Sequence, residues 1–295
     1  MTISSHPSAS GSLLLGGDLP VARMGFGAMK LPMRDWQGPA CDPEQSRAVL
    51  RRAVELGIDH IDTAWFYFFR DVSANALIRE ALHPYPENLV IATKVGPGRF
   101  PDGTWMNPAD RTGLREAVHR NLRELAVDRL DLVYLRRMPS QNSIAEPFAA
   151  LAELQQEGLI RHLGVSNVDA AQLAEAEAIA PVVAVQNKFS VLEHSTAGAA
   201  LMADCARRGI GFVPFFPIGG NGIPEHPVLA RVADRHGATR AQVMLAWLLA
   251  VSPTVLAIPG TSSPAHLEEN VAAASLRLDE ADLAELGALA GGLDK

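Results

Sequence analysis

Three residues with complementary acid-base chemistry, Asp62, Tyr67 and Lys94, lie at or near the ends of apolar runs in this sequence. A phenol has a pKa of about 10 in water, so it exchanges protons poorly at neutral pH unless a cation favours its ionised form. Lys94 can supply that cation, and Asp62 can keep the ammonium charged and oriented. The trio predicts a tyrosine that acts as general acid toward a carbonyl oxygen or general base toward an alcohol. The alternative is a structural ion pair beside a packing tyrosine.

Other chemically distinctive residues also follow apolar, strand-like runs that are separated by segments of helical length. They are Asp62, Lys94, Arg136, Ser166, Asn167, Gln186 and Phe215. In a barrel of alternating strands and helices, all of these positions lie on the one face where such barrels hold their active sites. The spacing therefore predicts a single pocket built from residues far apart in the chain.

The same alternation predicts the elements that must position these residues. We expect a short hairpin at 13–21, then strands at 24–29, 57–62, 89–93, 131–135, 160–165, 182–186, 210–215 and 254–258. Helices are expected from 43 to Gly57 and at 72–82, 109–126, 145–157, 169–179, 197–208, 239–250 and 264–273, with an extra helix at 279–289. Eight such units predict an α/β fold, a closed (β/α)8 TIM barrel, with an open doubly wound sheet as the alternative. No linker interrupts the pattern, so we expect a flexible segment at 1–12 and a single domain at 13–295.

The composition narrows the classes of partner. The chain has 295 residues, of which 48% are hydrophobic, and a formal net charge of -7. An acidic balance argues against a broad nucleic-acid surface, and the absence of a long apolar run argues against a membrane partner. The spacing of the histidines and cysteines indicates no metal site. We expect a cytoplasmic protein with a small-molecule substrate and no obligate protein partner.

Several motifs, in order along the chain, resemble those of the aldo-keto reductases. They are Gly57–Tyr67, Ile91–Lys94, Gly164–Asn167, Val185–Gln186 and Ile258–Thr261. Three further segments are similar to the bacterial pyridoxal reductase (pyridoxine 4-dehydrogenase) branch of that family: Asp131–Arg136, Val213–Gly220 and Ile258–Asn270. The resemblance implies hydride transfer from NADPH to an aldehyde or ketone. An ordered set of motifs is more specific than any one of them.

The resemblance assigns Asp62, Tyr67 and Lys94 to three of four catalytic positions. The fourth is usually a histidine, and this chain has Arg136 there. Arginine is a permanent cation with donors in a planar fork, and it can stabilise charge that develops on a carbonyl oxygen. Arg136 and Arg137 could instead form a solvated basic pair. Residues expected at the substrate mouth are Trp65, Phe66, Arg136 and Arg137. The aromatic residues could instead be ordinary barrel packing.

The resemblance also assigns a cofactor site. Ser166, Asn167 and Gln186 match positions that bind the nicotinamide carboxamide, and Phe215 matches the aromatic residue on which the ring stacks. The full predicted set is Ala28, Met29, Asp62, Ser166, Asn167, Gln186, Phe215, Phe216, Pro217, Ile218, Gly219, Gly220, Gly260, Thr261, Ser262, Ser263, His266, Glu269 and Asn270. Gly260 and His266 stand where many relatives have lysine and arginine. NADPH is nevertheless expected in preference to NADH.

Together these patterns predict an NADPH-dependent reductase of small aldehydes or ketones, with pyridoxal, reduced to pyridoxine, as the best named substrate. Two other functions remain open at this stage. One is a nicotinamide-binding regulatory or sensor protein with weak catalysis, because the usual histidine is absent. The other is a barrel lyase or isomerase, which would not oxidise NADPH.

Overall fold

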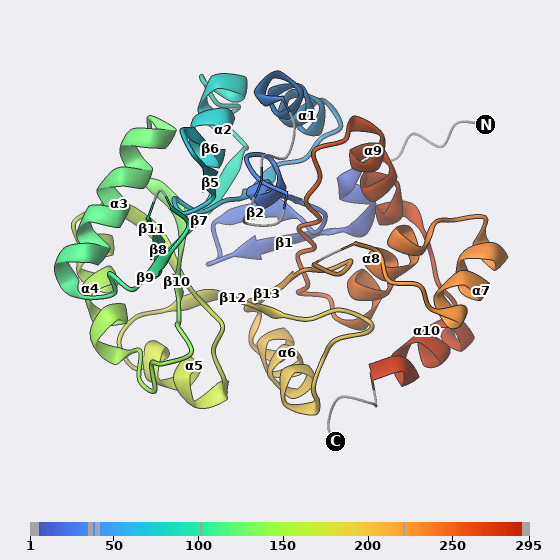
Figure 1. The fold of residues 1–295 in the computed structure, drawn as a ribbon. Helices are drawn as coiled ribbons and strands as arrows, with labels where there is room; N and C mark the ends of the chain where they lie inside the picture. The colour runs from blue at the N-terminus through green and yellow to red at the C-terminus, as the bar shows by residue number, and fades with distance from the viewer. Residues whose placement is uncertain (1–5, 35–37, 39–41, 101, 221, 291–295) are drawn as a thin grey trace.

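A computed structural model describes residues 6–34, 38, 42–100, 102–220 and 222–290, and it contains a curled parallel sheet surrounded by helices (Figure 1). Seven strands hydrogen-bond side by side in the order β13 (Gly211–Phe215), β12 (Val182–Lys188), β11 (Ile160–Ser166), β10 (Leu130–Arg136), β7 (Val90–Val95), β4 (His60–Asp62) and β3 (Phe26–Gly27). Each strand pairs in parallel with its neighbour, and the strands follow one another around the sheet in chain order. A doubly wound sheet is also parallel but reverses its strand order part-way, so this order confirms the barrel prediction and excludes that alternative.

The barrel closes through residues 254–258, but not as the regular strand that we predicted. This segment makes only isolated parallel bridges, from Ala257 to Met24 and from Val255 to Phe212. Gly25 N donates to Ala257 O at 2.8 Å, and Leu256 N donates to Phe212 O at 2.9 Å. The flanking residues Pro253 and Pro259 have no N–H to extend the ladder, so the eighth strand stays short.

Ten α-helices, each of 8 to 15 residues, surround the strands in the described part of the chain. They are α1 (Pro43–Glu55), α2 (Ala74–Leu82), α3 (Arg111–Leu125), α4 (Ala145–Gln156), α5 (Ala170–Glu177), α6 (Thr196–Arg208), α7 (Pro227–His236), α8 (Arg240–Val251), α9 (Pro264–Ala272) and α10 (Glu280–Gly287). The sequence pattern predicted all of them except α7. Two features of the sequence could have identified α7: Pro227 at its first position and Gly237 directly after its last residue. In the structure, Gly237 has the left-handed conformation that ends a helix.

Three short antiparallel hairpins leave the barrel. The predicted one pairs β1 (Ser12–Leu15) with β2 (Leu19–Ala22), whereas β5 (Phe68–Phe69) with β6 (Val72–Ser73) and β8 (Gly98–Arg99) with β9 (Trp105–Met106) were not predicted. Residues 72–73 belong to β6 and not to a helix, because Ser73 caps the amino terminus of α2.

Short 3₁₀ helices complete the described elements. They are η1 (Pro7–Ser10), η2 (Ala28–Lys30), η3 (Ala273–Ser275) and η4 (Ala288–Ala290). Of the segment 1–12 that we expected to be flexible, residues 1–5 lie outside the described residues, while η1 and the start of β1 occupy the remainder. Arg277 holds η1 by donating a hydrogen bond to Ala9 O at 2.7 Å.

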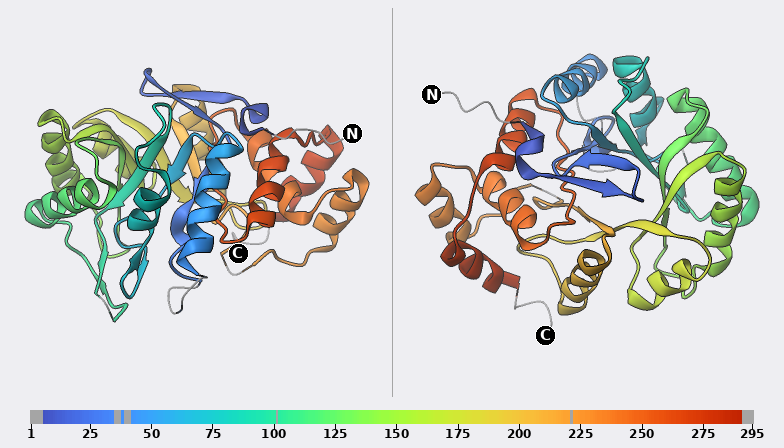
Figure 2. Two further views of the ribbon diagram at one scale, coloured as in Figure 1. Left: turned by 90° about the horizontal axis from the view of Figure 1, so that it is seen from above. Right: turned by 180° about the vertical axis from the view of Figure 1, so that it is seen from behind.

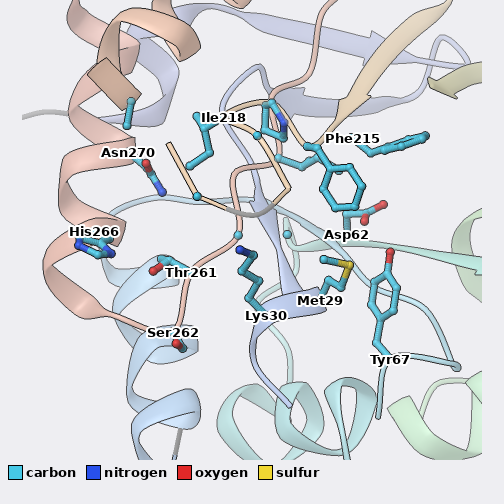
Figure 3. Close-up of a pocket in the computed structure, with 18 of the residues that line it drawn as sticks. Met29, Lys30, Asp62, Tyr67, Phe215, Ile218, Thr261, Ser262, His266 and Asn270 are labelled. Carbon is cyan, nitrogen blue, oxygen red and sulfur yellow. The ribbon is translucent and has the colours of Figure 1, made fainter. Parts of the chain in front are cut away.

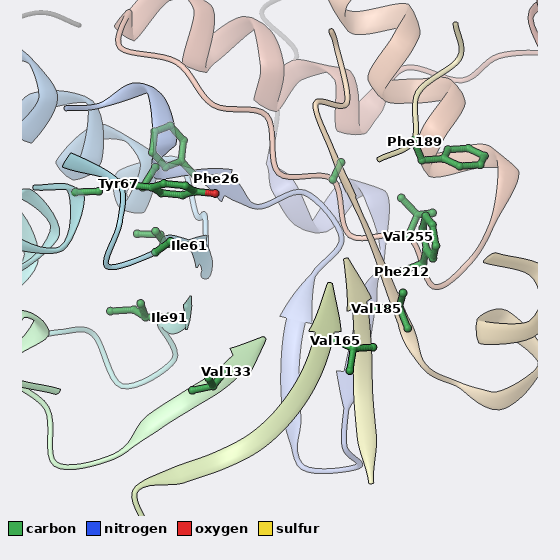
Figure 4. Packing of buried hydrophobic residues seen from close by; sticks show 14 of the residues in the cluster. Phe26, Ile61, Tyr67, Ile91, Val133, Val165, Val185, Phe189, Phe212 and Val255 are labelled. Carbon is green, nitrogen blue, oxygen red and sulfur yellow. The ribbon is translucent and has the colours of Figure 1, made fainter. Parts of the chain in front are cut away.

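Strand alternation separates two apolar clusters. Outward residues such as Val133 and Val185 pack against the helices (Figure 4). Inward residues such as Leu132 and Ala184 fill the barrel together with Leu15 of the β1–β2 hairpin. This hairpin covers the amino-terminal end of the barrel (Figure 2), so the opposite, carboxyl-terminal end is left for a pocket. None of the helices described here combines the length and the apolar character needed to cross a membrane.

Candidate active site

A cavity of about 460 Å³ opens at the carboxyl-terminal end of the barrel. Most of the predicted site residues line it: Met29, Asp62, Tyr67, Lys94, Arg136, Ser166, Gln186, Phe215, Phe216, Pro217, Ile218, Gly219, Gly260, Thr261, Ser262, His266, Glu269 and Asn270. Figure 3 shows Asp62, Tyr67 and Phe215 on one side of this pocket and Ser262 and His266 on the other. The structure therefore brings most of the predicted strand-end residues together in one pocket, with Asn167 as the exception.

Some predicted residues lie beside the pocket and do not line it. They are Ala28, Trp65, Phe66, Arg137, Asn167, Gly220 and Ser263. Conversely, the sequence patterns missed several lining residues: Gly27, Lys30, Arg34, Gly222, Ile223, Ala241 and Ile258. Most of the missed residues lie in loops or helices away from the strand ends, so strand periodicity alone could not find them.

A buried ion pair forms the base of the pocket. Lys94 Nζ lies 2.5 Å from Asp62 Oδ1, and both side chains are less than 5% exposed. Gln186 Nε2 donates to the other carboxylate oxygen, Oδ2, at 2.7 Å. Lys94 also donates to Thr63 O at 3.0 Å. Both charges are thus paired and hydrogen-bonded, as burial requires.

Strand register explains how the ion pair forms. Asp62 at the end of β4 pairs with Ala92 of β7, and Lys94 lies two residues further along β7. Residues two apart point to the same face of a strand, so both side chains enter the barrel. Tyr67 follows β4 in a loop held by hydrogen bonds from Tyr67 N to Ala64 O at 2.9 Å and from Ala74 N to Tyr67 O at 2.8 Å. Its ring centroid lies 4.9 Å from Lys94 Nζ.

The electrostatics of Tyr67 differ from the sequence prediction. Burial raises the pKa of its hydroxyl, and the nearby charge and hydrogen bond of Lys94 only partly oppose this effect. The expectation that Lys94 would lower the pKa of Tyr67 below its ordinary value is therefore wrong. Because burial is the larger effect, Tyr67 keeps its proton at neutral pH, which is the state that a general acid needs.

Lys94 is charged for a related reason. Burial alone would lower the pKa of its ammonium group, but the charge of Asp62, the effect of Tyr67 and their hydrogen bonds outweigh burial and raise it. Lys94 therefore keeps its positive charge beside Tyr67, although the Asp62–Lys94 pair as a whole is neutral.

The two neighbouring arginines have different surroundings. Arg136, at the end of β10, lines the pocket, and its guanidinium carbon lies 5.6 Å from the Phe66 ring centroid and 5.3 Å from that of Trp105. Arg137 instead donates from Nε to Asn167 O at 2.7 Å and from Nη1 to Gln141 O at 3.0 Å. The interpretation of both as a solvated pair is therefore wrong, and Arg137 acts as a brace for loops beside the pocket.

Comparisons with known proteins agree with this geometry. The model of the aldo/keto reductase family matches residues 23–290. The chain belongs to the aldo/keto reductase family. It is 45% identical over 276 residues to pyridoxine 4-dehydrogenase of Escherichia coli (strain K12), covering 92% of this chain and 95% of that protein. It is 39% identical over 272 residues to an uncharacterized oxidoreductase of Schizosaccharomyces pombe, covering 92% and 87%.

Solved structures of this family of oxidoreductases share the fold. An aldo/keto reductase from Klebsiella pneumoniae, solved in complex with NADP and acetate, matches with a TM-score of 0.78 and 26% identity over 94% of each chain. A thermostable aldo-keto reductase solved with the inhibitor epalrestat matches with a TM-score of 0.81 and 29% identity, covering 94% of this chain and 99% of that chain.

In this aldo/keto reductase, the distal end of the pocket is built from the start of α9. Ser263 caps that helix by accepting a hydrogen bond from His266 N at 3.4 Å, and Thr261 Oγ1 accepts one from Ser263 N at 3.0 Å. Free N–H groups and the dipole at a helix amino terminus suit a phosphate group. Ser262 and His266 line the pocket beside it.

Close backbone contact accounts for glycine at position 260. A Cβ atom built on Gly260 would lie 2.6 Å from Gly27 O, a distance at which one of the two segments must shift. A lysine, or any other residue with a Cβ atom, therefore cannot be introduced here without moving the backbone.

Cations that the sequence patterns missed lie elsewhere in the pocket. Lys30 of η2 lies between its two ends (Figure 3) and donates to Gly220 O at 3.1 Å, and Arg34 lines the rim. With Arg136 they add positive charge to the lining beyond the neutral Asp62–Lys94 pair, although the whole chain has a net charge of -7. Such a local concentration of cations attracts phosphorylated or otherwise anionic ligands. Within the described ranges, no group of three or more His, Cys, Asp or Glu residues is placed to hold a metal ion.

Proposed function

We propose that this protein is an NADPH-dependent reductase of small aldehydes and ketones in which Tyr67 is the general acid. The observation that carries the proposal is the buried Asp62–Lys94 pair beside the Tyr67 hydroxyl, at the base of a pocket rich in cations. The E. coli relative named pyridoxine 4-dehydrogenase and the Klebsiella pneumoniae structure that holds NADP support the same reaction class.

The residues of the pocket fit a nicotinamide dinucleotide. Gln186, Ser166 and Phe215 line the pocket; the first two would orient the carboxamide, and Phe215 would stack on the nicotinamide ring. Gly219 has a φ of +89°, a conformation that lets the backbone approach a pyrophosphate, and Lys30 supplies a nearby cation. At the far end, Ser262, His266 and the start of α9 would contact the 2'-phosphate that distinguishes NADPH from NADH.

Proton transfer follows from the arrangement around Tyr67. When bound, the reduced nicotinamide would supply the hydride that a carbonyl carbon accepts. Tyr67 Oη donates its proton to the carbonyl oxygen as the alcohol forms, and the Lys94 ammonium stabilises the tyrosinate that is left. Asp62 holds that ammonium in place, and Gln186 holds Asp62.

Arg136 supplies the second interaction with the carbonyl oxygen. Its guanidinium lines the pocket, and the sequence resemblance aligns it with the position where the family usually has histidine. A fixed cation aimed at the oxygen where negative charge develops lowers the barrier because its donors need no reorganisation during the reaction. Its permanent charge also means that this contribution does not titrate near neutral pH.

The substrate that we propose by name is pyridoxal, which would be reduced to pyridoxine. The 45% identity to the E. coli relative, across almost the whole length of both chains, supports this choice over an unrelated aldehyde. We also propose that the protein works in the cytoplasm and needs neither nucleic acid nor a partner protein.

A carbonyl panel that includes pyridoxal tests the proposal. The loss of NADPH absorbance should depend on both substrate and enzyme, and pyridoxal should be among the substrates with the highest kcat/KM. Tight NADPH binding without turnover of any carbonyl would instead favour a nicotinamide-binding sensor. If neither binding nor oxidation of NADPH occurs, a different class of barrel enzyme is indicated.

A further inference from the structure

Arg136 is a largely buried cation whose charge the protein does not neutralise. Among the described residues, its guanidinium has no carboxylate partner and no hydrogen bond; its recorded contacts are the faces of two aromatic rings. Burial lowers the pKa of this group because it disfavours the charged form. The neighbouring Arg137, in contrast, satisfies its donors with backbone carbonyls.

The surrounding rings hold this cation in place without using its N–H donors. Phe66 and Trp105 lie with ring centroids 5.7 Å apart and planes at 63°, and the guanidinium carbon of Arg136 lies within 6 Å of both centroids. Phe66 is fully buried, whereas Trp105 of β9 is 38% exposed. Cation–π contacts leave the edge of the guanidinium fork available to a ligand in the pocket.

A planar fork of donors can bind two oxygen atoms at once. The carbonyl oxygen of the substrate is one of them, and it becomes strongly negative only during the reaction. An ionised oxygen beside it would pair with the buried cation already in the ground state. The aromatic ring of Tyr67, which lines the same pocket, favours a flat ring as the remainder of the substrate.

We propose that Arg136 selects aromatic aldehydes that carry an ionised hydroxyl on the ring carbon next to the one bearing the aldehyde. One guanidinium N–H binds the carbonyl oxygen, and a second binds the adjacent phenolate. This inference rests on the proposed function, and it names the substrate class of the same site. Pyridoxal belongs to that class, but the inference extends to any ring aldehyde with the same pair of oxygens.

Two isomeric aldehydes test the inference. We would measure kcat/KM for 2-hydroxybenzaldehyde and 4-hydroxybenzaldehyde with NADPH, at a pH where both phenols are ionised. Wild-type protein should prefer the 2-hydroxy isomer by about tenfold or more, the size of one charge-assisted hydrogen bond. Arg136→Lys keeps the charge but loses the fork, so this variant should reduce the preference at least several-fold.

Arg137→Lys is the matched control, because it makes the same substitution one residue away and outside the pocket. It should change kcat/KM for both isomers by a similar factor and leave their ratio unaltered. Thermal melts and NADPH titrations of each variant identify any loss of folding or cofactor binding. An isomer ratio that is the same in wild-type protein and Arg136→Lys would overturn the inference, whatever the absolute rates.

A binding measurement separates this inference from the proposed function. If no aldehyde is reduced, the proposed function is wrong, and the affinities of 2-hydroxybenzamide and 4-hydroxybenzamide are then compared with the cofactor present. Tighter binding of the 2-hydroxy isomer that is lost in Arg136→Lys would still support the inference. Equal affinities would contradict it.

Discussion

The two ends of the pocket are built in opposite ways. At the catalytic end, Asp62 and Lys94 come from adjacent strands, are less than 5% exposed and are bonded to each other. At the distal end, Ser262 and His266 come from a loop and the first turn of α9, and His266 is exposed. At the catalytic end, burial strengthens the interactions between charged groups and shifts their pKa values. At the distal end, solvent screens such interactions.

This difference has a consequence for substitutions. A change at the catalytic end removes a proton donor or leaves a buried charge unpaired, and such effects amount to several kcal/mol. A change at the distal end would remove a solvated contact to the proposed 2'-phosphate. We therefore expect large effects on turnover at the first end and modest effects on cofactor choice at the second.

The largest effect should come from Tyr67→Phe, which removes the proposed proton donor and little else. We expect kcat to fall by about 10²- to 10⁴-fold, the range typical of general acid-base catalysis, with the NADPH dissociation constant almost unchanged. Steady-state kinetics and a cofactor titration measure the two quantities.

Tyr85→Phe is a matched control for this substitution. Tyr85 donates to Leu125 O at 2.7 Å, outside the pocket, so its loss should affect stability more than turnover. Comparable losses of kcat in the two variants would assign the proton transfer to another group.

Arg136→Met should have the next largest effect. Removing a donor to the developing oxyanion commonly costs about 2.7 to 4 kcal/mol, or about 10²- to 10³-fold in kcat. Arg137→Met should change kcat much less, because Arg137 binds backbone carbonyls and does not line the pocket. Single-turnover kinetics with saturating NADPH compare the two, and equal small losses would remove Arg136 from the mechanism.

The pH dependence of the free energy of unfolding tests whether water reaches the buried His60 ring at the base of the pocket. His60 precedes Asp62 on β4, neither ring nitrogen has a hydrogen-bond partner in the described part of the chain, and burial lowers the pKa of its ring from 6.5 to about 4. Protons therefore bind the unfolded state more readily. The stability contributed by the neutral ring is fully present above pH 6.5 and is lost as the pH falls toward 4, by about 3 kcal/mol at 1.36 kcal/mol for each pKa unit.

Urea unfolding of wild-type protein and His60→Gln at several pH values measures this contribution. The variant should lose less stability than the wild type between pH 6.5 and pH 4, even if it is less stable at neutral pH. Parallel pH profiles would mean that water reaches His60 in the folded protein.

The smallest effect should come from the distal end. Changing Ser262 and His266 together to alanine should reduce the preference for NADPH over NADH by about tenfold, since charge-assisted hydrogen bonds to one phosphate are lost. Ser263 is left intact because it caps α9. Fluorescence titrations with both cofactors measure the ratio, and an equal loss of affinity for NADPH and NADH would place the 2'-phosphate elsewhere.

The sequence by itself determined the parts of this protein that depend on periodicity. Alternating strand and helix patterns predicted the barrel, and residues at strand ends, including Asp62, Lys94, Arg136 and Gln186, were correctly expected to line one pocket. This works because side-chain direction in a strand has a period of two and parallel strands end on one face.

Only the tertiary structure decided the features that depend on distance between segments. Lys30 and Arg34 reach the pocket from the chain after β3, and the unpredicted β8–β9 hairpin brings Trp105 to Arg136. The direction in which the pKa of Tyr67 shifts is a further case, because burial raises this pKa and the Lys94 charge lowers it. Sequence spacing identifies the two groups, but burial is a property of everything packed around them.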